Sequence, residues 1–135
     1  MIIIYSLGGE IKYTIENEYN FNKNNLENNQ RLIVTDNENI KTNTHYIAKG
    51  EPKLKEKINI NINSQKIKAG EVLKLTLETE KTNTEIKMKI NDIEFSVKIE
   101  NNQGAKKIEL KEPDGYKISC IDHRFISQSV KVEVV

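Results

Sequence analysis

The stretch Ile58-Asn59-Ile60-Asn61-Ile62-Asn63 decides the fold class, because apolar and polar residues alternate along its whole length. Successive side chains of a β-strand point to opposite faces, so this alternation places the isoleucines on one face and the asparagines on the other. The same period recurs at 72–78, 85–90, 93–100, 106–111, 116–121 and 129–135. Strands with one apolar and one polar face are typical of antiparallel sheets with one solvated side. We therefore expect an all-β protein.

Short turns separate these strands. Asn91-Asp92 lies between two alternating runs, which is the spacing of a two-residue hairpin with left-handed turn residues. Further turns are predicted at Ala69-Gly70-Glu71, Asn102-Gln103-Gly104 and Pro113-Asp114-Gly115. Strands that follow one another with turns every 8–12 residues or so indicate a sandwich or a barrel. We predict that residues 58–135 form an immunoglobulin-like antiparallel β-sandwich.

Tyr116 occupies a distinctive position in that sandwich. It follows Asp114-Gly115 at the start of the penultimate predicted strand. In immunoglobulin-like sandwiches, a tyrosine at this place hydrogen-bonds back to the backbone across the corner. We therefore interpret Tyr116 as a structural corner residue and not as a binding residue.

The first 57 residues follow a different pattern. Ile2–Leu7 and Ile11–Ile15 flank Gly8-Gly9 and are predicted to form a hairpin. Residues 16–31 are rich in asparagine, and we expect a loop there with at most one short helical turn. The apolar run Leu32-Ile33-Val34 is predicted to be a buried strand.

A second hairpin is predicted before residue 57. Thr44–Ala48 and Lys53–Lys57 flank the turn Lys49-Gly50-Glu51-Pro52. Its proline belongs in the turn or at a sheet edge, because proline cannot donate a hydrogen bond to a ladder. We thus expect a small N-terminal β meander over 1–57 and the sandwich over 58–135. The two units are expected to be stiffly joined, because no glycine- or serine-rich linker separates them.

Charge and hydropathy argue against nucleic-acid and membrane partners. The 135 residues carry a net charge of +1, and the two signs are interspersed, so no basic stripe could follow a phosphate backbone. The opening Ile2-Ile3-Ile4-Tyr5 is short and has no basic residue before it, so we expect no signal peptide. No window approaches the about 20 apolar residues of a membrane span. The single Cys120 can form no intrachain disulfide, which suits a reducing cytosol.

No catalytic or metal centre is predicted. Cys120 and His123 are three positions apart, so on a strand they would point to opposite faces, and we interpret Cys120 as a core residue. His45 is remote, and no spacing matches a zinc or calcium site, so Asp122-His123-Arg124 is predicted to be a polar loop. Phosphate-binding loops and nucleophile elbows are missing from the sequence. We expect no catalytic residue, no cofactor and no metal.

Apolar side chains at two places are candidates for contact with another protein. The first group is aromatic and lies in the N-terminal unit, where it forms either the core or an exposed contact surface: Tyr13, Tyr19, Phe21 and Tyr46. The second is Val134-Val135, which ends the chain without a polar tail. Strands at Ile2–Tyr5 and Val130–Val135 are predicted edges that could pair with a neighbouring subunit. For the C-terminal strand, burial in the sandwich is the favoured alternative.

The order of these motifs carries a resemblance to a known family. An opening unit begins Ile2-Ile3-Ile4-Tyr5 and ends Thr44-His45-Tyr46-Ile47 and Lys49-Gly50-Glu51-Pro52-Lys53-Leu54. The sandwich closes with Glu112-Pro113-Asp114-Gly115-Tyr116-Lys117-Ile118, Arg124-Phe125-Ile126 and Val130-Lys131-Val132-Glu133-Val134. This layout resembles small tail-associated proteins of tailed bacteriophages and prophages. The resemblance covers most of the chain through short motifs, and it implies no catalytic residues.

The resemblance implies a structural protein of a virion, such as a tail fibre, baseplate or adaptor component. Such a protein would be made in the host cytoplasm and assembled with other virion proteins, as a homo-oligomer or symmetric ring. A role in host attachment would add a cell-surface receptor as a partner. Alternatives are a capsid decoration or head fibre protein and a bacterial immunoglobulin-like adhesion module. An enzyme or carbohydrate-binding protein would require a deep polar pocket around His45 or His123.

Overall fold

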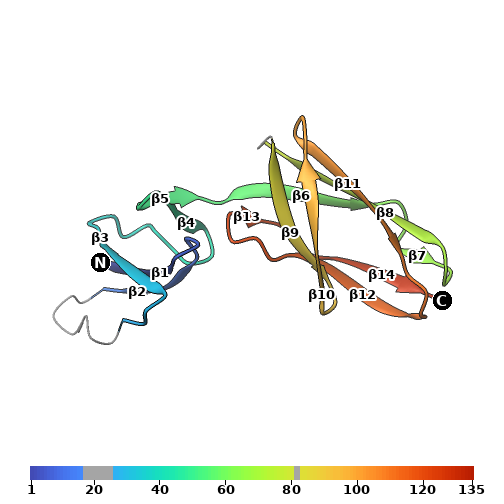
Figure 1. The fold of residues 1–135 in the computed structure, drawn as a ribbon, viewed down its shortest axis with the longest axis horizontal. Coiled ribbons are helices and arrows are strands. Elements are labelled where there is room, and N and C mark those ends of the chain that lie inside the picture. The colour runs from blue at the N-terminus through green and yellow to red at the C-terminus, as the bar shows by residue number, and fades with distance from the viewer. Residues whose placement is uncertain (17–25, 81–82) are drawn as a thin grey trace. The chain divides into compact units, whose positions relative to one another are not determined.

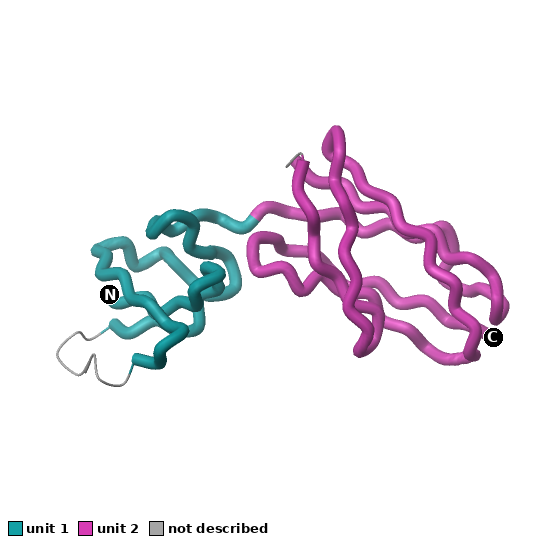
Figure 2. The backbone as a smooth tube through the Cα atoms, in the orientation of Figure 1, with its two compact units in different colours: residues 1–55 teal, residues 56–135 magenta. Residues whose placement is uncertain are grey.

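The computed structural model describes residues 1–16, 26–80 and 83–135, and all regular structure in them is β (Figure 1). The chain divides into two compact units, Met1–Lys55 and Glu56–Val135 (Figure 2). The predicted all-β fold with a C-terminal sandwich is confirmed. The N-terminal unit also consists of strands, but they do not follow the up-and-down order of a meander.

The first unit contains a three-stranded antiparallel sheet in the order β2-β1-β3. Its strands are β1 (Ile2–Ser6), β2 (Ile11–Ile15) and β3 (Gln30–Val34). The β1–β2 hairpin forms as predicted, but β1 lies between two partners, so it is not the edge strand that we expected. The expectation that Leu32-Ile33-Val34 is buried is also wrong. As part of the edge strand β3, its Val34 side chain stays 58% exposed.

A two-stranded sheet completes this unit. Strands β4 (His45–Ala48) and β5 (Glu51–Leu54) are joined by Lys49 and Gly50, whose φ angles are 51° and 73°. Two successive left-handed residues are the geometry of a tight two-residue hairpin, so the turn is shorter than the predicted 49–52. Pro52 lies in β5 opposite Ile47, at a sheet edge where its missing donor is tolerated.

The second unit is a sandwich of two sheets. Its strands are β6 (Glu56–Ile62), β7 (Lys66–Ile67), β8 (Val72–Thr79), β9 (Thr84–Ile90), β10 (Ile93–Ile99), β11 (Gln103–Glu109), β12 (Asp114–Cys120), β13 (Phe125–Ile126) and β14 (Val130–Val134). One sheet has the order β10-β9-β12-β14-β7 and the other β11-β8-β6-β13. If the two-residue strands β7 and β13 are left out, the chain changes sheet after β8, β10 and β11, as in an immunoglobulin-like sandwich.

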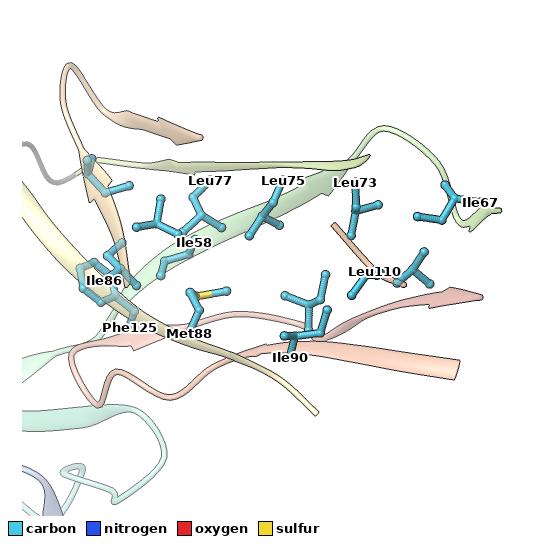
Figure 3. Packing of buried hydrophobic residues seen from close by; sticks show 14 of the residues in the cluster. Ile58, Ile67, Leu73, Leu75, Leu77, Ile86, Met88, Ile90, Leu110 and Phe125 are labelled. Atoms are coloured by element: carbon cyan, nitrogen blue, oxygen red, sulfur yellow. The ribbon is translucent and has the colours of Figure 1, made fainter. Parts of the chain in front are cut away.

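The core lies between these sheets and consists of the apolar residues that alternate along each strand. Leu73, Leu75 and Leu77 of β8 are fully buried and face Met88 and Ile90 of β9 (Figure 3). The intervening side chains of both strands are mostly exposed. The period of two therefore selects which side chains pack between the sheets.

The sandwich is not purely antiparallel. The short strand β13 pairs in parallel with the start of β6, and β7 pairs in parallel with the end of β14. The end of β14 therefore lies between β12 and β7, and the prediction that Val130–Val135 is an edge is wrong for its last residues. Strands β13 and β7 lie toward opposite ends of the sandwich (Figure 1).

The passage from β10 to β11 differs from the predicted turn at 102–104. The left-handed residues are Asn101 and Asn102, with φ angles of 51° and 67°. Gly104 instead lies buried inside β11. A Cβ atom there would approach the Lys98 carbonyl oxygen and the Ile99 Cδ1 atom to 2.7 Å. Glycine is therefore required at this position by the closeness of β10, and not by a turn.

Candidate interaction surface

The six apolar residues proposed as contacts occupy different environments. Tyr46 and Val134 are only 8% and 3% exposed, so their assignment to a surface is wrong. Val134 packs in the sandwich core because it points to the same inner face of β14 as Val132, and β7 pairs with that end of the strand. Tyr13 and Val135 are exposed by 42% and 49%. The remaining pair, Tyr19 and Phe21, lie outside the described residues.

Tyr116 makes the hydrogen bond that its position suggests. Its hydroxyl donates to the Glu112 carbonyl oxygen, four residues upstream, at 2.8 Å. Beside it, the Lys117 amide donates to Asn91 Oδ1 at 2.9 Å, and the Asn91 amide donates to the Lys117 carbonyl at 2.9 Å. These bonds tie the start of β12 to the β9–β10 hairpin, in which Asn91 is left-handed with a φ of 49°. Tyr116 thus has a structural role here.

The predicted polar loop at 122–124 contains a partly buried ion pair. Arg124 holds Asp122 with two bonds, from Nε to Oδ1 at 2.9 Å and from Nη2 to Oδ2 at 2.8 Å. The same guanidinium donates to the Glu85 carbonyl at 2.8 Å and to Thr84 Oγ1 at 3.1 Å. The Asp122 side chain is 6% exposed and that of Arg124 is 29% exposed. The pair therefore fixes the chain between β12 and β13 to the start of β9.

The ion pair also determines the protonation of its carboxyl group. Burial by itself raises the pKa of Asp122. Several interactions outweigh that effect and hold the pKa below its ordinary value of 3.8. They are the hydrogen bonds from the Arg124 side chain and amide, the charge of Arg124 and the hydrogen bond from the Lys87 amide. Asp122 is therefore a permanent anion at neutral pH, fully engaged with its neighbours.

The residues singled out for nucleophilic or metal chemistry do not converge. Cys120 is partly buried against the core, and its thiol lies 3.8 Å from the Asp122 carbonyl oxygen. His45 Nδ1 is 2.7 Å from Thr44 Oγ1 in the other unit. Across the described ranges, no three or more of His, Cys, Asp and Glu gather as metal ligands would. Nor does any described helix have the length and apolarity to cross a bilayer.

The side of the sandwich between β6 and β14 contains an open groove, which we call the seam. Its larger part has a volume of about 610 Å³ and is lined by Lys57–Asn61 and Glu78 on one side and Ile126–Val130 on the other. A second hollow of about 440 Å³ shares Ile60, Asn61, Ser129 and Val130 with it and extends to Gln65. Strands β13 and β7 cover only the ends of this side, so its middle stays open.

The backbone hydrogen bonds of β6 show which groups face the seam. In an antiparallel pair, successive residues of a strand direct their amide and carbonyl groups alternately toward and away from the partner. The Asn63 amide donates to the Lys74 carbonyl at 3.1 Å, in register with the ladder between β6 and β8. Asn61 and Asn59 share this parity, so their backbone groups bond to β8.

The isoleucines between these asparagines have the opposite parity. The amide and carbonyl groups of Ile60 and Ile62 therefore point away from β8, toward the seam. On that side β13 pairs with Glu56 and Lys57 alone, and within the described ranges no strand continues this pairing. The side chains of Ile60 and Ile62 are only partly buried against the core. The seam thus offers an unpaired strand edge beside incompletely covered apolar side chains.

The sequence shows that this strand lacks the residues that protect an edge, but it does not show that the strand is an edge. The run Ile58–Asn63 has no charged residue, whereas native edge strands are commonly protected by lysine or proline. Whether a strand is an edge depends on its neighbours, and these are distant in the sequence.

Neither the models of known protein families nor the curated proteins match this chain.

Proposed function

We propose that the protein is a non-enzymatic structural component of a phage virion, associated with the tail, that acts through protein–protein contacts. The observation that carries this proposal is the unpaired edge of β6 in the seam. An open strand edge binds other chains by adding a strand to the sheet, with main-chain hydrogen bonds as the source of affinity. The resemblance of the sequence motifs to tail-associated proteins supports the assignment to a virion.

The chemistry of the seam favours a protein partner over a small molecule. Its lining consists mostly of neutral polar side chains, isoleucine and the backbone of the strand edge, with Lys57, Glu78 and Lys131 as its charged members. A ligand pocket usually gathers a few polar groups in a concave apolar site that buries the ligand. The seam is instead an open groove along a strand, which suits an extended polypeptide.

The proposal is tested by mass spectrometry of virions purified from the source strain, followed by placement of the chain in a particle map. We expect the chain in washed particles, with density on the tail. Density on the capsid would replace the tail assignment by a decoration or head fibre role. A chain missing from intact particles but present in the infected cell would overturn the virion assignment.

A further inference from the structure

We propose that the partner at the β6 edge is a second copy of this chain, paired in antiparallel fashion about a two-fold axis at Asn61. The pairing would join the sheet β11-β8-β6 of one copy to that of the other as one continuous sheet. This inference deepens the proposed function and rests on its claim that the seam is a contact surface. It does not depend on where in a particle the protein lies.

The edge of β6 is available for pairing. The Ile60 and Ile62 backbone groups face the seam, and β13 occupies the same side only at Glu56 and Lys57. Residues 59–63 therefore form a free edge about 17 Å long, at about 3.4 Å per residue. That length is typical of a strand in globular proteins.

The edge of β6 also matches a second copy of itself. An antiparallel two-fold pairing of Ile58–Asn63 places isoleucine opposite isoleucine and asparagine opposite asparagine on each face. No like charges meet, because this stretch contains none. The other long edges of the sandwich differ, since β11 carries Lys106 and Lys107 and β10 carries Glu94 and Lys98. Charges on an edge oppose pairing, so β6 is the edge suited to a second copy.

The positions of the outward-facing backbone groups set the register of the pairing. With the axis at Asn61, residue 59 lies opposite 63 of the second copy, and Ile60 lies opposite Ile62. Both isoleucines direct their amide and carbonyl groups outward, so each such pair can exchange both hydrogen bonds. An axis at Ile60 would place Lys57 inside the pairing, where β13 already lies. The axis at Asn61 therefore uses the free edge and avoids the covered part.

Disulfide trapping tests this register. Under the proposal, Asn61 faces Asn61 of the second copy in a non-hydrogen-bonded pair, with Cα atoms about 4.5 Å apart, close enough for a disulfide. We expect Asn61→Cys, in a Cys120→Ala background, to form about ten-fold more disulfide-linked dimer than Asn59→Cys, since facing cysteines share a high effective concentration. The control residue Asn59 is also exposed on the outer face of β6, but it would lie opposite residue 63. Equal trapping of the two variants, or none, would overturn the proposed pairing.

Charge at the axis gives an independent test by light scattering of the full chain over a range of concentrations. We expect wild type to approach twice the monomer mass as its concentration rises, and Asn61→Lys and Asn61→Glu to stay monomeric. A mixture of the two variants should regain the dimer, because lysine then faces glutamate. The control Ala105→Lys, exposed on β11, should behave like wild type. A wild type that remains monomeric up to its solubility limit would overturn the inference.

The two proposals can fail separately. If Asn61→Lys abolishes the dimer and the chain is missing from particles, the β6 pairing is retained and the virion role is rejected. A monomeric wild type that is found in particles would reject the pairing and retain the virion role.

Discussion

The two lateral sides of the sandwich are closed in different ways. On one side the chain itself crosses between the sheets, through left-handed Asn101 and Asn102 and then Gly104 packed against β10. On the other side β6 and β14 border an open groove, and short parallel strands cover only its ends. The closed side depends on individual residues with special backbone requirements, namely a left-handed φ at Asn102 and the absence of a Cβ atom at Gly104. The open side is bordered by the neutral alternating strand β6. We therefore expect substitutions on its exposed face to leave the stability of the monomer nearly unchanged and to affect the pairing of two copies.

The largest effect is expected from Gly104→Ala on the closed side. The new Cβ would meet the Lys98 carbonyl oxygen at 2.7 Å, and a backbone atom cannot move aside without shifting β10. We expect a loss of about 3 kcal/mol in the free energy of unfolding, measured by urea denaturation. Gly115→Ala is the matched control, because a Cβ there meets nothing within 4 Å. If both variants lose equal stability, the close packing of β10 against β11 is not the reason for the glycine.

The next effect concerns the ion pair that anchors one end of the seam. Asp122→Asn leaves the Arg124 charge without its carboxylate, next to the point where the Arg124 carbonyl accepts from the Glu56 amide at 3.1 Å. Because Arg124 is partly exposed, we expect a loss of about 2 kcal/mol, less than for a fully buried pair. Glu100→Gln, which removes the exposed pair with Lys98, should change stability by less than about 0.5 kcal/mol. Similar losses for the two variants would show that the Asp122 pair behaves as a surface pair.

The same carboxyl group predicts a pH dependence. Its pKa in the folded protein lies below the ordinary 3.8, so the anion stabilises the folded state at pH values above 3.8. That contribution is lost as the pH falls through the folded-state pKa. The difference in unfolding free energy between wild type and Asp122→Asn should thus be constant near neutral pH and shrink below pH 3.8. Urea titrations at a series of pH values measure it, and a difference that grows toward acid pH would contradict the assignment.

A smaller effect is expected in the turn on the closed side. Asn102 has a φ of 67°, a conformation that alanine adopts at a penalty of about 1 kcal/mol. We expect Asn102→Ala to lower the free energy of unfolding by about that amount, and Asn102→Gly to stay close to wild type. Thermal melts of the three proteins compare them directly. An alanine variant as stable as the glycine variant would show that backbone strain does not limit this turn.

The smallest effect is expected on the open side. Asn61 is exposed on the outer face of β6, so Asn61→Lys should change the stability of the monomer by less than about 0.5 kcal/mol. The measurement is made at a dilution where wild type is monomeric, with Ile58→Lys on the buried face of the same strand as the destabilised reference. A large loss from Asn61→Lys would mean that this edge already serves the monomer.

The fold followed from the sequence wherever a residue's role depends on its near neighbours. The alternation in Ile58–Asn63 and its counterparts predicted the strands, and the position of Tyr116 predicted a bond back to the preceding backbone, which ends at Glu112. The hairpin at Asn91-Asp92 also forms, with left-handed Asn91 in the turn.

The errors concern contacts between segments that are distant in the sequence. Gly104 resembles a turn glycine until β10 is placed beside it, and Val134 resembles an exposed terminus until β7 covers it. Strand β7 comprises only two residues, Lys66 and Ile67, too few to show a periodicity. The free edge at Ile60 and Ile62 could not be predicted for the same reason, because it depends on which strand pairs with each side of β6.

Hydrogen exchange at individual amides of β6, followed by NMR as a function of protein concentration, tests directly whether the β6 edges of two copies pair. The Asn59 and Asn61 amides should exchange slowly at every concentration, because they bond to β8. The Ile60 and Ile62 amides should exchange rapidly at high dilution and become protected as the concentration rises and the edges of two copies pair. Protection of these two amides that does not change with concentration would contradict the pairing of two β6 edges.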